Sequence, residues 1–155
     1  MKIIVKRLSN VDKEELSKYL IKVDKDFSPA LSDYHSDLIK YAEQLLEKGI
    51  VWLSIVDNQS VGMIAVYAND TENKNAYLAI LSTIQQYRKL GVAQKMMTVL
   101  LEYLCTTKMQ KIRVRSNNPS AIYLYKKNGF IESGEEYVKG KHKFWLECDI
   151  NNKIL

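Results

Sequence analysis

The chain has 155 residues, 46% of them hydrophobic and 26% charged, which is typical of one globular domain that builds its core without disulfides or bound metal. Its formal net charge of +5 favours contact with anions, but the lysines are scattered and form no basic stripe with interleaved aromatic residues, so we expect no nucleic-acid partner. No apolar run has the length of a membrane span or a signal peptide, which argues against membrane contact and predicts a single cytoplasmic domain over residues 1–155.

The first half of the chain predicts one strand, two helices and a hairpin. Residues 2–8 have the branched apolar composition of a strand, and Ser9 with Asp12 can cap the helix that follows. This helix and a second one, stopped by Gly49, are indicated by apolar residues at helical spacing: Leu16, Tyr19, Leu20 and Val23, then Leu38, Tyr41, Ala42, Leu45 and Leu46. Residues 24–35 between them predict a loop, with or without a helical turn. Residues 50–56 and 61–68 predict the two strands of a hairpin.

The second half alternates strands with helices. Residues 76–84 predict a strand, and Val92 opens a helix whose apolar face comprises Met96, Val99, Leu100, Tyr103 and Leu104. Residues 111–116 predict a strand, residues 119–130 a short helix, and residues 137–150 a hairpin that turns near Gly140. The predicted order gives an α/β protein with about seven strands in a mixed sheet, covered by about four helices.

The two cysteines, Cys105 and Cys148, each lie inside an apolar run. We therefore expect both to be small buried hydrophobic residues in a reducing compartment. The sequence has no Cys-x-x-Cys motif and no Cys/His ligand spacing, so we expect no metal site.

The stretch TIQQYRKLGVAQK, residues 83–95, lies between a predicted strand and a predicted helix. Unpaired amides at a helix start can hold a phosphate, Gly91 permits close backbone approach, and Arg88, Lys89 and Lys95 add positive charge. A glycine turn flanked by basic residues is also common in loops that bind nothing. Neither G-x-x-x-x-G-K-[ST] nor G-x-G-x-x-G occurs, which argues against a Walker loop and a Rossmann dinucleotide site.

Two motifs taken together resemble the GNAT superfamily of N-acetyltransferases. The first is [Q/R]-x-x-G-x-[G/A], here Arg88, Lys89, Leu90, Gly91, Val92 and Ala93, and the second comprises Asn118, Ala121, Tyr125, Gly129 and Phe130. The order of predicted elements also matches, so the resemblance covers nearly the whole chain. It implies a GNAT-type three-layer fold with a mostly antiparallel sheet, and an acyltransferase that uses acetyl-CoA as cosubstrate without a metal.

The resemblance implies that backbone amides of residues 89–94, beside Arg88, hold the pyrophosphate of CoA, while the pantetheine arm follows the preceding strand. The implied cofactor-binding residues are Leu81, Ser82, Thr83, Arg88, Lys89, Leu90, Gly91, Val92, Ala93, Gln94 and Asn118. Tyr125 is the implied general acid, because a phenol beside the sulfur can give its proton to the departing thiolate. Without the two motifs, Tyr125 would be one aromatic residue on a short apolar helix that also carries Ile122 and Tyr123.

The implied reaction is direct transfer of an acetyl group to a primary amine of a small molecule or a peptide, with an amino sugar as one candidate. The acceptor cleft is implied to lie between residues 24–37 and 134–143, near Tyr67 and Asn69, where the carboxylates of residues 24–37 could attract a cationic amine. The group that takes the proton from the amine is left open among Asp70, Glu135, Glu136, His142 and a water relay.

Two hypotheses from other classes stay open. A non-catalytic module could keep the cofactor site and sense acyl-CoA, although the intact Tyr125 counts against it. A nucleic-acid-binding protein would show an affinity that falls steeply with salt. The sequence does not distinguish a monomer from a homodimer.

Overall fold

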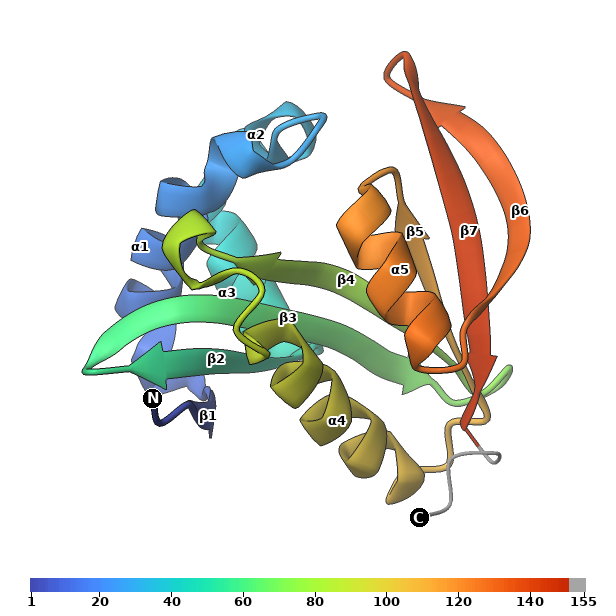
Figure 1. The fold of residues 1–155 in the computed structure, drawn as a ribbon, viewed down its shortest axis with the longest axis horizontal. Helices are drawn as coiled ribbons and strands as arrows, with labels where there is room; N and C mark the ends of the chain where they lie inside the picture. Colours follow the sequence, from blue (N-terminus) through green and yellow to red (C-terminus); the bar gives the residue numbers. More distant parts are fainter. Residues whose placement is uncertain (151–155) are drawn as a thin grey trace.

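A computed structural model describes residues 1–150, and the last five residues of the predicted domain lie outside this description. The backbone forms one seven-stranded sheet in the order β1-β2-β3-β4-β5-β7-β6 (Figure 1). The strands are β1 (Ile4–Arg7), β2 (Ile50–Val56), β3 (Gln59–Asp70), β4 (Asn75–Thr83), β5 (Lys111–Ser116), β6 (Ile131–Val138) and β7 (Lys141–Asp149). Only the β4–β5 pair is parallel among these strands, so the predicted mixed, mostly antiparallel sheet is confirmed.

Five α-helices and three 3₁₀ turns connect the described strands. The helices are α1 (Lys13–Val23), α2 (Leu31–Tyr34), α3 (Leu38–Lys48), α4 (Val92–Cys105) and α5 (Pro119–Lys127), and the turns are Asn10–Asp12, Asp24–Asp26 and Gln85–Tyr87. The four predicted helices are confirmed, and α2 is a short fifth one inside the predicted loop 24–35. The Ser9 amide donates to the Asp12 carboxylate (2.8 Å), as a cap requires, but the first turn that it closes is 3₁₀.

The helices cover both faces of the sheet. α1 and α3 pack together on one face, and α4 and α5 lie on the other (Figure 1). Leu16 and Leu20 of α1 and Met96 and Leu100 of α4 have no exposed surface, so each helix buries the apolar stripe that the sequence indicated. β2 and most of β3 are buried along their length because helices cover both of their faces. The arrangement confirms a three-layer α/β fold.

Two glycines mark places where backbones approach closely. A Cβ on Gly62 in β3 would lie 2.9 Å from the Met96 Cε and 3.0 Å from the Ser82 carbonyl oxygen. Gly49 ends α3 as predicted, but its φ of −116° is ordinary for any residue. Its small size matters instead, because a Cβ there would lie 3.0 Å from the carbonyl oxygens of Leu45 and Val66.

The separation of β4 from β5 is the feature that shapes the site. Their pairing covers only Asn75–Tyr77 and Lys111–Arg113, and beyond it the two strands diverge (Figure 1). On the other edge of β4, Ala65 pairs with Ile80 and Val66 with Leu78, so Ala79 is an extra residue that forms a bulge. The bulge reverses the alternation of side chains along β4 and places the Tyr77 ring on the face that α3 covers, where it acts electrostatically on Tyr41.

Two sequence predictions need correction. The C-terminal hairpin begins at Ile131 and not at residue 137, because nearly every residue at the start of β6 is exposed and the strand has no apolar alternation to reveal it. Cys148 is buried as predicted, whereas Cys105 is exposed, because it ends α4 outside the buried stripe of that helix. No helix within residues 1–150 has both the length and the apolar character needed to cross a membrane.

Candidate functional site

The turn between β4 and α4 has the backbone geometry of an anion site. Lys89 and Gly91 have left-handed φ values of 63° and 86°, and α4 begins directly after Gly91. The Lys95 amide donates to the Gly91 carbonyl (3.0 Å), but no hydrogen bond in the described part of the chain engages the three amides before it, those of Val92, Ala93 and Gln94. A Cβ on Gly91 would meet nothing within 4 Å, so an anion can approach these amides.

The basic side chains of this turn do not all face the amides of Val92, Ala93 and Gln94. Arg88 donates through Nε to the Thr83 carbonyl (2.9 Å) and lies 3.7 Å from the Asp26 carboxylate, so it ties the turn to β4 and to the segment after α1. Lys95 donates to the Ile3 carbonyl (2.7 Å) and is therefore directed toward the N-terminal segment. Lys89 is exposed at the turn itself. The positive field at the site comes mainly from the helix start, with Lys89 beside it.

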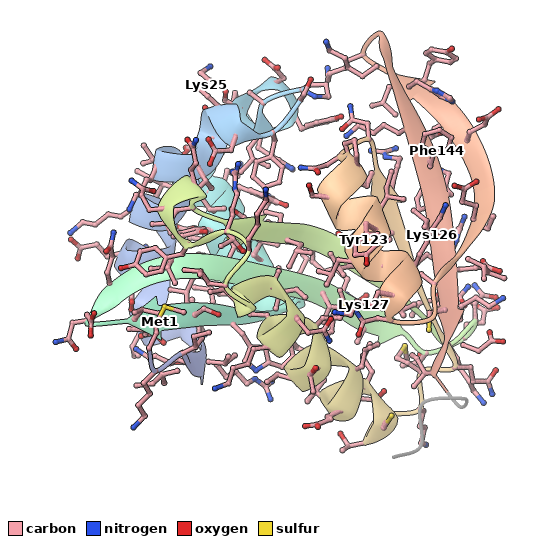
Figure 2. All side chains as sticks on the ribbon, in the orientation of Figure 1. Met1, Lys25, Tyr123, Lys126, Lys127 and Phe144 are labelled. Atoms are coloured by element: carbon pink, nitrogen blue, oxygen red, sulfur yellow. The ribbon has the colours of Figure 1, made fainter. Side chains whose placement is uncertain are left out.

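Tyr125 lies on the inner side of α5. Its side chain is 3% exposed and packs against Phe130 at a ring distance of 5.4 Å, whereas Tyr123 two residues earlier is 72% exposed on the outer side (Figure 2). Burial raises the pKa of the Tyr125 phenol well above its ordinary value, and the nearby Tyr77 phenol raises it further. Tyr125 is thus a protonated phenol at neutral pH. Its pKa depends in part on Tyr77, which lies on the opposite face of the sheet.

The remaining predicted cofactor residues border the gap between β4 and β5. Asn118 is the N-cap of α5, where its Oδ1 accepts from the amides of Ser120 (2.9 Å) and Ala121 (3.2 Å), and no described hydrogen bond engages its Nδ2. Sequence reasoning missed this capping role, although an asparagine directly before a proline at a helix start is a signal for it.

The three predicted cofactor residues of β4 are Leu81, Ser82 and Thr83, and their side chains are buried or partly buried. The Ser82 hydroxyl is buried and lies 3.1 Å from the Tyr19 hydroxyl of α1. Thr83 has a buried hydroxyl with no hydrogen-bond partner within residues 1–150, and Leu81 is partly buried against the core. These residues present their backbone to the gap, because the pairing of β4 with β5 ends at Tyr77 and no other described strand pairs with that edge of β4.

A pocket of about 250 Å³ lies where β3, β4, β5 and β7 meet. It is lined by Tyr67, Asn69, Asp70, Asn75, Ala76, Tyr77, Arg113 and Trp145. Tyr67 and Asn69 were expected near the acceptor cleft, whereas sequence reasoning missed Tyr77, Arg113 and Trp145. Arg113 stacks over the Trp145 ring at 4.3 Å, and Tyr77 connects the pocket electrostatically to Tyr125.

The predicted proton acceptors differ in their surroundings. Asp70 lines the pocket and accepts from the Asn73 amide (3.0 Å). Glu136 accepts from Arg115 (2.6 Å) and from Trp145 (3.1 Å), and the Arg115 hydrogen bond lowers the pKa of Glu136 below its usual value. Glu135 contacts only His142 (3.0 Å) among these groups and is exposed on β6. Asp70 is therefore the carboxylate that the fold brings to the pocket.

The carboxylates of residues 24–37 have structural partners. Asp33 accepts from the Ala30 amide (3.0 Å), Asp37 caps α3 through the amides of Ile39 and Lys40 (3.1 Å each), and Asp24 accepts from the Ser32 amide (2.7 Å). Asp26 pairs with Arg88 (3.7 Å). These carboxylates stabilise the loop through their hydrogen bonds and the ion pair. They therefore attract a cationic amine less strongly than four unpaired carboxylates would.

Comparisons with known proteins agree on one family. Residues 16–130 match the model of the Acetyltransferase (GNAT) family. The chain is 31% identical over 108 residues to N-alpha-acetyltransferase 50 of Danio rerio, a match that spans 64% of this chain and 64% of that protein. Within residues 1–150, no group of His, Cys, Asp and Glu side chains is arranged to hold a metal ion.

Solved structures of low sequence identity share the fold. A GNAT-family acetyltransferase of Staphylococcus aureus Mu50 has a TM-score of 0.77 at 20% identity, with 96% of this chain and 99% of that chain covered. Arabidopsis thaliana NAA60 in complex with acetyl-CoA has a TM-score of 0.75 at 15% identity, with 97% and 99% covered. Because the family model spans most of the sequence and the two family motifs flank the gap between β4 and β5, the chain belongs to the GNAT family of acetyltransferases.

Proposed function

We propose that this protein is an acetyl-CoA-dependent N-acetyltransferase that transfers an acetyl group directly to a primary amine of a small molecule or peptide. The observation that carries the proposal is the gap between β4 and β5. Helix-start amides without a described hydrogen bond lie at one end of the gap, α5 with the buried Tyr125 follows β5, and a polar pocket is formed by β3, β4, β5 and β7.

The residues around the gap fit the cofactor. The turn at Gly91 suits a pyrophosphate, held by the amides of residues 89–94, while the Arg88 side chain anchors the turn to β4 and Asp26. The unpaired edge of β4 along residues 81–83 offers backbone donors and acceptors to an extended amide chain such as pantetheine, as an added strand would use them. The Asn118 Nδ2 donates from the other side of the gap. Bound acetyl-CoA supplies the activated acetyl group as a thioester.

The chain provides the acid and the polarising groups for the transfer. Amides of β4 that face the gap donate to the carbonyl oxygen on which negative charge develops. As the new C–N bond forms and the C–S bond breaks, the Tyr125 hydroxyl gives its proton to the sulfur, and the phenolate takes up a proton from solvent before the next turnover. The amine loses its own proton on the pocket side, where Asp70, a carboxylate that lines the pocket, accepts it directly or through a water molecule.

The acceptor is an amine that enters through the pocket lined by Tyr67, Tyr77 and Trp145. One relative is an N-alpha-acetyltransferase by name, and a structural neighbour at 20% identity is the NatC complex bound to a Gag peptide and CoA. Both names favour a peptide amino terminus as the first acceptor to test. Amino sugars, the other candidate acceptors, belong in the same panel.

The test measures thiol release from acetyl-CoA with peptides, amino sugars and polyamines as acceptors. We expect release with at least one acceptor, and we expect Tyr125→Phe to lower kcat by about 10²- to 10⁴-fold, the usual contribution of a general acid. Tyr123→Phe is the matched control, because that residue lies on the outer side of the same helix. Binding of CoA without turnover on the whole panel would support an acyl-CoA sensor instead, and a Tyr125→Phe enzyme with unchanged kcat would remove Tyr125 from the mechanism.

A further inference from the structure

Two helices of the candidate site are joined by a reciprocal pair of side-chain amides. The Gln94 Nε2 donates to the Asn128 Oδ1 at 2.9 Å, and the Asn128 Nδ2 donates to the Gln94 Oε1 at 2.9 Å. Both side chains are half-buried, so the two hydrogen bonds are partly protected from competition with water. Since each amide uses a donor and an acceptor toward the other, the pair defines the relative position of both side chains.

Asn128 is the residue that ends α5. Its backbone amide donates to the carbonyls of Leu124 (3.2 Å) and Tyr125 (3.0 Å), and its Nδ2 also donates to Leu124 (2.8 Å). Its carbonyl is contacted by the Cys148 thiol of β7 (3.9 Å). Any displacement of the Asn128 side chain is therefore transmitted to the last turn of α5, which carries Tyr125 three residues earlier.

Gln94 lies at the other end of the pair, in the first turn of α4. Its backbone amide is one of the three that the described hydrogen bonds leave unengaged, and it faces the proposed phosphate site. Its side chain points in another direction, to Asn128 and to the Thr98 hydroxyl (3.2 Å). One residue thus contributes its main chain to the anion site and its side chain to the helix of the proposed acid.

We propose that Gln94 and Asn128 are positioning residues for catalysis: their amide pair sets the distance between the phosphate-binding turn of α4 and the Tyr125 hydroxyl. The proposal rests on the proposed function. It follows from geometry, since α4 and α5 are separate helices on one face of the sheet and the pair connects their functional ends. Loss of the pair would let α5 shift relative to the turn, and small misplacements of reacting groups lower rates strongly.

The test combines Asn128→Ala and Gln94→Ala with Tyr125→Phe in double-mutant cycles. In the otherwise wild-type protein, we expect each alanine variant to lower kcat by about 10- to 100-fold with little change in KM for acetyl-CoA. In the Tyr125→Phe background, we expect the same alanine substitutions to have almost no further effect on kcat. Thr98→Ala is the matched control, because it removes the other side-chain partner of Gln94 and keeps the amide pair.

The alternative is that the pair only stabilises the fold. In that case, both alanine variants would lower Tm while kcat of the folded protein stayed unchanged. Alternatively, kcat would fall by the same factor with and without the Tyr125→Phe substitution. Either result would overturn the proposal. Gln94→Asn combined with Asn128→Gln keeps two amides and should recover part of kcat if their pairing is what matters.

A second measurement does not depend on turnover. The Tyr125 ring carbon that carries the hydroxyl can be followed by ¹³C NMR and assigned by its loss in Tyr125→Phe. We expect this signal to titrate above the ordinary phenol range in the wild-type protein and closer to that range in Asn128→Ala, because a displaced α5 admits water. An unchanged signal would overturn the positioning role. If no amine is acetylated but this signal changes, the proposed function fails while the positioning of Tyr125 by the pair is retained.

Discussion

Gly91→Ala separates the cost of backbone strain from the loss of a binding site. Gly91 has a φ of 86°, in the left-handed region, and a Cβ built there meets no atom within 4 Å. The substitution therefore causes no steric clash in the protein without ligand, and its cost is the strain of a left-handed alanine, about 1–2 kcal/mol. For a chain of this size, that cost corresponds to a fall in Tm of about 2–8 °C.

The effect on cofactor binding should be larger. The new methyl group occupies the open side of the turn, where a pyrophosphate would approach the amides of α4. In the wild-type protein, CoA at 100 times its Kd should add about 2.7 kcal/mol to the free energy of unfolding, which raises Tm by roughly 5–10 °C. We expect Gly91→Ala to lose most of that increase at the same CoA concentration.

The assay is thermal unfolding with and without CoA, and Gly140→Ala is its matched control. Gly140 also has a left-handed φ, 78°, and open space around its Cβ position, but it lies in the turn between β6 and β7. It should show the same fall in Tm and keep the full increase with CoA. If Gly91→Ala keeps the full increase, or if Gly140→Ala loses it, the turn before α4 is not the pyrophosphate site.

Two other predictions concern stability. Gly62→Ala should lower the free energy of unfolding by about 1–3 kcal/mol in urea titrations, because its Cβ would lie 2.9–3.1 Å from atoms of α4 and β4. Gly134→Ala is the control and should leave the free energy of unfolding unchanged, because the nearest atom to its Cβ would lie 4.0 Å away. Equal effects of the two substitutions would contradict the packing argument. Burial raises the pKa of Tyr19 to about 12 and also raises the pKa of Tyr41 and Tyr125, so the folded state holds these protons more tightly than the unfolded state. Stability should be complete below about pH 10 and fall as the pH rises toward 12, measured by urea midpoints together with absorbance at 295 nm; midpoints that stay constant up to pH 11 would refute it.

The elements of the fold were largely predictable because their signals are local. The apolar stripes of α1, α3 and α4 repeat at helical spacing and are buried as expected. The start of β6 was missed because its residues are exposed on both sides and show no alternation. Cys105 was misplaced because an apolar neighbourhood in sequence does not tell which side of a helix end faces solvent.

The candidate site was predictable only in part. The two motifs indicated Gly91, Asn118 and Tyr125, but the partners of the charged side chains depend on residues far away in sequence. Lys95 donates to Ile3, 92 positions earlier, and Arg88 binds the end of β4 and Asp26. Neither contact could be derived from the motif, because the motif does not specify which distant residues lie next to it in the folded chain.

By itself, the sequence determined the order of strands and helices, the position of the turn proposed to bind phosphate and the residue proposed as the acid. These features follow from periodicity, from the conformational freedom of glycine and from short motifs, all of which act within a few residues. Only the tertiary structure decided the rest: the bulge at Ala79, the divergence of β4 from β5, the pocket around Tyr77, and the pairing of Gln94 with Asn128 across 34 positions. The physical reason is that strand register and side-chain partners are set by packing between distant segments, and this packing exists only once the whole sheet and its helices have assembled.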